Sequence, residues 1–451
     1  MINRDGYSVP CTVSLFLLGL FSETKVFLFG CIAISELVVF FAAPIVFLCL
    51  RREMFHRGFC TFLYMACATI VAMLCSSWVN DTAFVFVLKS FASMYSIVAY
   101  YIVFYALLRR SLKHGLGWFV VGEALSLMII IYALNPAAEV SSESFGYMGT
   151  IDTEFIVNSQ LFWVQRLKAL MQLPIVFAYL KCPLAYSILT PLLFTAFTLF
   201  TSVSGRSASL SILLFGAMVI VGRKSRHAMR NMGRHTILLL LVAVAVVFFY
   251  KGVYNYMAQH GWLGNDAQTK YESQTRGGTG GIIQLLMSGR KEFFIGIPAA
   301  LDKPILGHGP FAEDRDRYTE RFMVQYGEPD DIELYYKIAY HNLLSGHISR
   351  IPTHSHIIGA WVHYGIVGLI FWLWILYLIF QHIRHYADAI PQWYGYFALY
   401  ISSYLWHIFF SPLGSRHFMA LFIVCLFFAR AVGKRKMFLP PDMEMDARKY
   451  D

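Results

Sequence analysis

Long apolar runs fill most of this chain and decide what it can fold into. The strongest runs lie at 27–50, 59–78, 83–108, 117–134, 183–202, 208–222, 236–252, 357–381, 393–411 and 417–432. Most approach the roughly 20 residues that a helix needs to cross a hydrocarbon core. Charged residues make up 14% of the chain, against about 25% in a soluble domain. The sequence therefore predicts an all-α integral membrane protein.

Basic residues predict which loops face the cytoplasm. They gather in four clusters, at Arg51, Arg52 and Arg57, at Arg109, Arg110 and Lys113, at 223–234, and at 434–436. Since Lys and Arg favour cytoplasmic loops, all four clusters belong on one side. This requires that the weaker run 166–181 also crosses, and counting the weak run 11–22 as a crossing as well places the N-terminus in the cytoplasm. We therefore expect about twelve transmembrane helices with both termini in the cytoplasm.

The remaining composition excludes several kinds of protein. The net charge of +10 is explained by cytoplasmic loops, so we expect no nucleic-acid partner. All eight cysteines lie in or beside apolar runs and without zinc spacing, so they predict neither a disulfide framework nor a metal site. The run 11–22 continues almost directly into the next, without the small-residue pattern of a cleaved signal.

The crossings divide the chain into three parts. Residues 1–252 hold nine transmembrane helices with short loops, 253–356 form a long outer loop, and 357–451 hold the last helices and a cytoplasmic tail. A loop of this length is usually functional or disordered. Phe293, Phe294, Ile297 and Leu301 have helical spacing, which predicts a helix over 289–301, and a second helix is expected at 330–344.

Two arginines in the outward-facing parts are suited to binding anions. Arg206 lies in the turn between the runs 183–202 and 208–222, and an arginine near hydrocarbon often marks a pathway or an anion site. Arg290 opens the predicted helix at 289–301, where its guanidinium can pair with two phosphate oxygens. The alternatives are a headgroup anchor for Arg206 and a surface salt bridge for Arg290.

A glycine-rich turn and two histidines complete the candidate site. Gly307 and Gly309 lie in the turn 303–310, where glycine lets the backbone approach a ligand closely. His354 and His356 precede the run 357–381, and a histidine at a membrane edge is suited to proton transfer near neutral pH. A helix-capping or interfacial role explains such a histidine equally well.

Together these segments resemble the O-antigen ligase and polymerase superfamily of bacterial envelope glycan transferases. That family has a serine–arginine turn between central helices, then a long periplasmic loop with an arginine and a Pro-x-x-Gly-x-Gly turn. The loop ends in a histidine about eleven residues before a Gly-Ile-x-Gly helix. In this chain Arg206, Arg290, Pro304–Gly309 and His354–Gly365 follow in that order. The resemblance covers roughly 160–380.

Two features of the histidine segment depart from the family pattern. Asparagine usually follows the family histidine, whereas Ser355 follows His354 in this chain. A literal His-Asn pair occurs at His341-Asn342, but its distance from the glycine helix is wrong. The assignment to His354 therefore depends on spacing, with His356 as a close competitor.

The resemblance implies an activity, a location and a set of partners. Such enzymes transfer a glycan from undecaprenyl diphosphate to a hydroxyl on the periplasmic side of the inner membrane, in lipopolysaccharide biosynthesis, with a GT-C-like architecture. The acceptor is lipid A-core for a ligase and a second lipid-linked glycan for a polymerase. The reaction is expected to be inverting and to need neither metal nor cofactor. Catalysis is expected from His354, Arg290 and Arg206, and binding of diphosphate or acceptor from Arg166, Gly307, Gly309, Arg416 and His356.

Two other functions compete with this one. A transporter or flippase of an anionic lipid-linked substrate also needs cations at the membrane face, but the halves show no matching pair of broken helices. A metal-dependent glycosyltransferase could use Asp330, Asp331 and Glu333, or the histidines of 341–356.

Overall fold

The computed structural model describes seven main stretches of the chain. These are residues 9–22, 25–27, 31–50, 57–109, 112–133, 291–327 and 349–389, with short pieces between 252 and 268, 332 and 340, and 404 and 425. Most of these residues are helical, as the sequence predicts.

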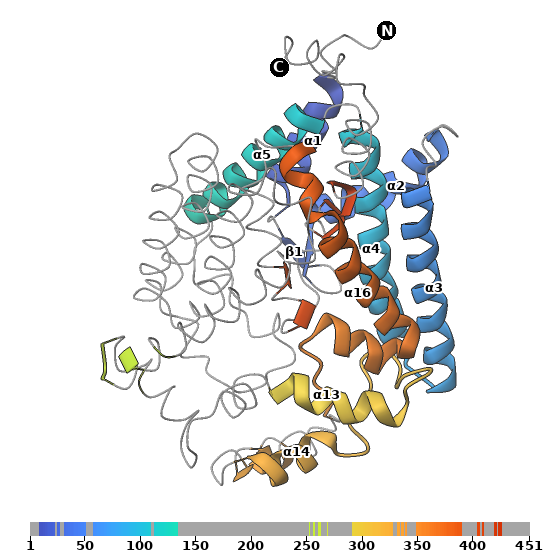
Figure 1. The fold of residues 1–451 in the computed structure, drawn as a ribbon, viewed down its shortest axis with the longest axis vertical. Coiled ribbons are helices and arrows are strands. Elements are labelled where there is room, and N and C mark those ends of the chain that lie inside the picture. Colours follow the sequence, from blue (N-terminus) through green and yellow to red (C-terminus); the bar gives the residue numbers. More distant parts are fainter. Residues whose placement is uncertain are drawn as a thin grey trace.

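Three described helices are long and apolar enough to cross a membrane, over Gly58–Val79, Phe84–Leu108 and His356–Ile379. They belong to α3 (Arg57–Val79), α4 (Phe84–Leu108) and α16 (His356–Ala389), which lie alongside one another in Figure 1. Helix α5 (Leu112–Ala133) and two shorter apolar helices, α1 (Val9–Leu20) and α2 (Ile34–Cys49), accompany them. The helices predicted from the runs 59–78, 83–108, 117–134 and 357–381 are confirmed. The other predicted crossings after residue 134 lie outside the described residues, apart from Gly252 and short helical pieces within 393–411 and 417–432.

A small sheet departs from the all-α prediction. Strand β1 (Lys25–Phe27) pairs antiparallel with β2 (Cys31–Ala33), so the apolar run that starts at residue 27 becomes helical only at Ile34. Val26, Phe27 and Ile32 have the β-branched and aromatic side chains that favour extended pairing.

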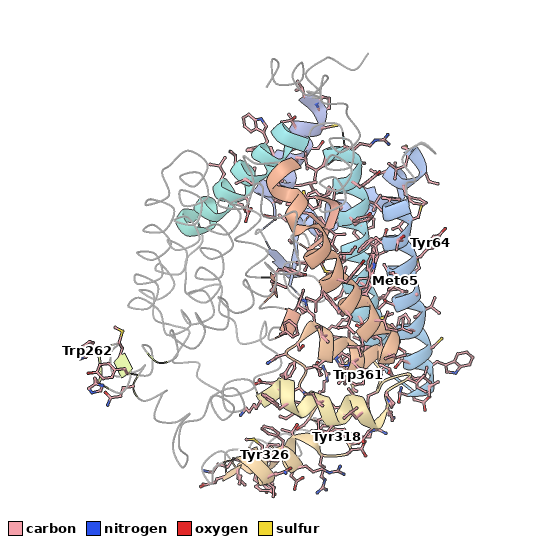
Figure 2. The ribbon with its side chains drawn as sticks, in the orientation of Figure 1. Tyr64, Met65, Trp262, Tyr318, Tyr326 and Trp361 are labelled. Carbon is pink, nitrogen blue, oxygen red and sulfur yellow. The ribbon has the colours of Figure 1, made fainter. Side chains whose placement is uncertain are left out.

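Aromatic side chains join three of the long helices. The ring of Phe62 in α3 lies 4.0 Å from Tyr101 in α4 and 6.3 Å from Phe371 in α16, between ring centroids. Large apolar side chains also point outward, including Tyr64, labelled in Figure 2, at 74% exposure and Trp78 at 85%. Exposed apolar faces of this kind suit contact with lipid.

Glycines allow α1 and α5 to pack backbone against backbone. A Cβ at Gly19 would overlap the carbonyl of Phe119, and a Cβ at Gly122 would overlap the carbonyl of Phe16. Small residues at a crossing point are the usual basis of close helix packing in membranes.

Two further helices cover the end of the bundle at which α3 ends and α4 and α16 begin (Figure 1). Helix α13 (Lys291–Asp302) confirms the helix predicted at 289–301, but the buried face differs. It consists of Ile295, Gly296, Ala299 and Ala300, whereas Leu301 is 59% exposed. The small residues on this face permit a close approach, since a Cβ at Gly296 would lie 2.6 Å from the Ile358 side chain of α16. Helix α14 (Tyr318–Tyr326) follows.

Helix α16 is interrupted at Gly365, which has φ +66° and ψ −156°. The interruption frees backbone groups that a continuous helix would pair with each other. The carbonyl of Val362 instead accepts from the His308 N–H at 2.6 Å, and the Ile366 N–H donates to the Ile305 carbonyl at 3.2 Å. The turn at 305–308 therefore completes the hydrogen bonding of a membrane helix.

Replacing Gly365 should destabilise this junction. Its backbone conformation is essentially restricted to glycine and costs other residues about 1–3 kcal/mol, and a Cβ there would overlap the Ile305 carbonyl. We expect Gly365→Ala to lower the thermal unfolding temperature in detergent. Gly359→Ala in the same helix is the control, because its Cβ would meet only ordinary contacts at 3.4 Å. Equal unfolding temperatures for the two variants would contradict the proposed junction.

Candidate functional site

The structure describes four of the eight predicted site residues, namely His354, His356, Gly307 and Gly309. The other four, Arg166, Arg206, Arg290 and Arg416, lie outside the described residues. In the sequence Arg290 directly precedes α13, which begins at Lys291.

The turn 303–309 is bound to α16 and to the end of α3. Asn80 donates from Nδ2 to the Gly307 carbonyl at 3.1 Å, and the Lys303 ammonium donates to Asn80 Oδ1 at 2.8 Å. On the other side, the indole of Trp361, labelled in Figure 2, donates to the Pro304 carbonyl at 3.1 Å. Two motifs recognised separately in the sequence, the proline–glycine turn and the Gly365 helix, are thus direct neighbours.

Both glycines of the turn have positive φ, +76° at Gly307 and +87° at Gly309. The close backbone approach that they permit is made to the protein itself. A Cβ at Gly307 would lie 2.6 Å from the Val362 carbonyl, and one at Gly309 would overlap the Thr82 hydroxyl. These contacts explain the glycines structurally, and their role in binding substrate stays a prediction.

Two histidines without a predicted role hold these segments together. His308 is 8% exposed and donates from Nε2 to the Ala299 carbonyl at 2.7 Å. Burial lowers the pKa of His308, although the bond to Ala299 opposes this shift. His363 donates from Nδ1 to the Gly309 carbonyl at 2.9 Å, which leaves Nε2 to accept from the Thr353 hydroxyl at 3.1 Å. The only sequence signal was their position inside the two glycine motifs.

His354 lies beside a partly buried carboxylate. Its Nδ1 is 3.7 Å from Oε1 of Glu292, in the first turn of α13, and the side chains are 37% and 16% exposed respectively. Burial alone would raise the pKa of Glu292, but the His354 ring, the backbone N–H of Glu292 and the charge of Lys291 together hold it below its usual value. Glu292 is therefore ionised at neutral pH and faces one nitrogen of an accessible imidazole.

His356 has a different environment from His354. It is 4% exposed, with its ring centroid 4.6 Å from Trp372 and 5.9 Å from Tyr404. Sequence spacing did not decide which of these two histidines is the functional one. The structure distinguishes them, because the His354 ring is accessible and the His356 ring is enclosed.

The segment 311–319, which follows the glycine turn, is held by hydrogen bonds to Asp314 and by a ring contact of Phe311. Asp314 accepts hydrogen bonds from the backbone N–H groups of Tyr318 and Thr319 at 2.7 and 3.0 Å, which caps α14. Arg350, just before the histidines, lies 4.1 Å above the Phe86 ring and 5.6 Å from that of Phe311. Nothing in the local sequence around Arg350 indicated this stacking, because its partners come from distant segments.

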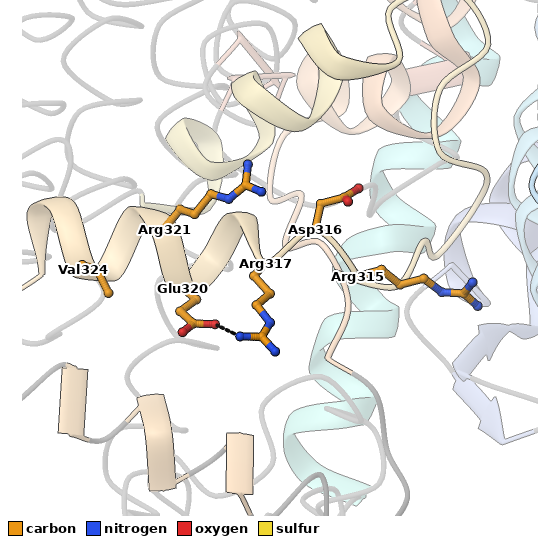
Figure 3. Close-up of a pocket in the computed structure, with 6 residues that line it drawn as sticks. All are labelled: Arg315, Asp316, Arg317, Glu320, Arg321 and Val324. Carbon is orange, nitrogen blue, oxygen red and sulfur yellow. Dashed lines mark hydrogen bonds and ion pairs between the residues drawn. The ribbon is translucent and has the colours of Figure 1, made fainter.

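An open pocket lies beside α14, separate from His354 (Figure 3). Its volume is about 520 Å³, and it is lined by Arg315, Asp316, Arg317, Glu320, Arg321 and Val324. Two of its arginines are already paired, Arg315 with Glu313 at 2.9 Å and Arg317 with Glu320 at 3.5 Å. No residue predicted from the sequence lines this pocket.

Among the residues that the structure describes, no group of three or more His, Cys, Asp or Glu side chains could hold a metal ion. Asp330, Asp331 and His341, which a metal-dependent mechanism could use, lie outside the described residues. Glu333 pairs with Lys337 at 2.7 Å. The described residues between 332 and 340 are helical, in agreement with the helix predicted there.

Comparison with protein-family models, with curated proteins and with solved structures gives no match for this chain. Its function is therefore argued from the motifs and from the geometry of the site.

Asn80 should be the main polar link between the α3 end and the turn 303–309. Asn80→Ala leaves the Gly307 carbonyl without this donor, so we expect a loss of about 1–2 kcal/mol in the free energy of unfolding. Lys303→Ala removes only the exposed end of the same contact and should cost less than about 0.5 kcal/mol. Thermal unfolding in detergent measures both, and a larger effect of the lysine would contradict this account.

Proposed function

We propose that this chain is a membrane glycan transferase, which moves a glycan from undecaprenyl diphosphate to a hydroxyl acceptor at the periplasmic face of the bacterial inner membrane. The observation that carries the proposal is that four segments distant in the sequence lie close together. The proline–glycine turn, the His354 segment, the Gly365 break and the start of α13 after Arg290 meet at one end of the α3, α4 and α16 bundle. These are the segments on which the resemblance to the O-antigen ligase and polymerase superfamily rests.

The proposed chemistry follows from the negative charge that develops on the leaving diphosphate. The acceptor oxygen attacks the anomeric carbon while the bond from that carbon to the diphosphate breaks, and its electron pair leaves with the diphosphate. Arg206 and Arg290 neutralise the leaving group in a site from which water is partly excluded. His354 takes the hydroxyl proton. Attack opposite the diphosphate inverts the configuration, and the acceptor is either lipid A-core or a second lipid-linked glycan.

The contact between Asn80 and the turn 303–309 supports the proposed topology. Because α4 leads away from this end of the bundle, the chain must cross the membrane an odd number of times before it returns at α13. The proposed crossings are five, at 117–134, 166–181, 183–202, 208–222 and 236–252. Without 166–181 the number would be even, so the contact favours the complete set of about twelve helices.

The proposed topology can be tested by cysteine labelling in a variant without native cysteines. We expect an introduced cysteine at the exposed Lys303 to react with a membrane-impermeant reagent from outside. A cysteine at Ser225, in the basic cluster 223–234, should react only after the membrane is opened. Labelling of Ser225→Cys from outside would invert the proposed orientation.

A flippase is the main alternative. Transporters of lipid-linked substrates place their key residues near the bilayer midplane, between broken helices. His354 instead lies two residues before the start of α16, and the turn 303–309 is bound to Asn80, directly after the end of α3. Helix ends are where a lipid-linked donor meets a water-soluble acceptor group, which favours transfer over transport.

His354 should carry the proton transfer. We expect His354→Ala to lower glycan transfer by about 100-fold or more, within the usual range for a general acid–base group. His356→Ala removes an enclosed ring and should lower thermal stability while the folded fraction keeps most of its turnover. The measurement is initial transfer rate with purified protein, corrected for the folded fraction.

Two outcomes would change the assignment. An inactive His356→Ala beside an active His354→Ala would move the functional histidine by two residues. Full activity in both would leave the transfer to the arginines and make both histidines structural.

A further inference from the structure

Among the described residues, Glu292 of α13 is the charged group that pairs with His354, which lies in the segment before α16. Its carboxylate lies 3.7 Å from His354 Nδ1 across the junction of α13 with the segment that precedes α16. The carboxylate is 16% exposed, whereas the Glu313 and Glu333 side chains of other ion pairs in this loop are 37% and 66% exposed. A half-exposed imidazole facing a mostly buried carboxylate is the arrangement in which one ring nitrogen is oriented and the other stays accessible.

The chemistry of the pair distinguishes the two ring nitrogens. An ionised carboxylate only accepts hydrogen bonds, so it favours the His354 tautomer with the proton on Nδ1. Nε2 then carries the lone pair and can accept a proton. When Nε2 becomes protonated, the ring is an imidazolium and the adjacent carboxylate stabilises its charge. At 3.7 Å the contact is longer than a hydrogen bond, and such contacts commonly tighten when substrate binds.

We propose that Glu292 is a positioning residue, which orients His354 through Nδ1 so that Nε2 takes the proton of the acceptor hydroxyl. This inference rests on the proposed function. The proton passes from the acceptor oxygen to Nε2 as the new bond to the anomeric carbon forms, and then to solvent or to the departing diphosphate. Glu292 itself gains no proton and touches no reacting atom.

The position of α13 also relates the His354–Glu292 pair to Arg290. Glu292 lies two residues after Arg290, which is the proposed partner of the diphosphate. Because the face formed by Ile295, Gly296, Ala299 and Ala300 fixes α13 against its neighbours, the helix start and Glu292 are fixed with it. The start of α13 would then supply the group that orients the base, two residues after the proposed partner of the diphosphate in the sequence.

The test compares Glu292→Gln, His354→Ala and the double variant in the glycan transfer assay. Glutamine keeps the size of the side chain and removes its charge, so we expect kcat to fall about tenfold or more while KM for the lipid-linked donor stays near the wild-type value. In the double variant the second substitution should add little to His354→Ala, because Glu292 acts through the histidine. Glu313→Gln, in the ion pair with the exposed Arg315 of the same loop, is the control and should transfer at the wild-type rate.

Each outcome bears on one of the two proposals. If wild-type protein transfers no glycan, the proposed function fails and the positioning role fails with it. If the wild type is active and Glu292→Gln keeps its kcat, or if the two losses multiply in the double variant, only the positioning role fails. If the glutamine variant does not fold, Glu292→Asp replaces it. Its carboxylate is one methylene further from Nδ1, and an unchanged kcat would overturn the inference.

Discussion

Inside α16, Gly365 releases the Val362 carbonyl and the Ile366 N–H from their helical partners, and the turn 305–308 bonds both. Unpaired backbone groups are costly at membrane depth, so the helix and the turn need each other. The Ser76 hydroxyl adds a bond to the His363 carbonyl at 2.9 Å, which brings α3 into the same junction. This junction also restricts where α13 and His354 lie. Helix α13 ends at Asp302, just before the turn, and His354 lies just before α16 begins at His356.

The junction also explains how a polar site is held at the end of an apolar bundle. His308 and His363 use ring nitrogens to bind backbone carbonyls, and Asn80 links the turn to α3. These side chains satisfy the irregular backbone, while His354 stays partly exposed beside Glu292. The side chains that bind backbone carbonyls are therefore distinct from the His354–Glu292 pair, of which only the His354 ring is readily accessible.

Apolar run length was sufficient to predict α3, α4, α5 and α16, since these helices depend on burial in hydrocarbon more than on local partners. The strands at Lys25–Phe27 and Cys31–Ala33 were missed because a short apolar run has no decisive period. Motif spacing singled out His354 and the glycine turn. Motif spacing could not find Glu292, because a lone glutamate after Arg290 and Lys291 is expected to be a solvated surface charge. Its contact with His354 forms only when α13 packs against the bundle. Long-range pairs of this kind are not encoded in local spacing.

The central claim is that a glycan is transferred covalently at this end of the bundle. The most direct measurement supplies purified wild-type protein in proteoliposomes with an undecaprenyl-diphosphate-linked glycan, lipid A-core, a second lipid-linked glycan and a chelator. The account predicts that one acceptor gains the mass of the glycan and that free undecaprenyl diphosphate is released, with the chelator present. Movement of the intact lipid-linked glycan across the bilayer, with no mass gained by either acceptor, would contradict it.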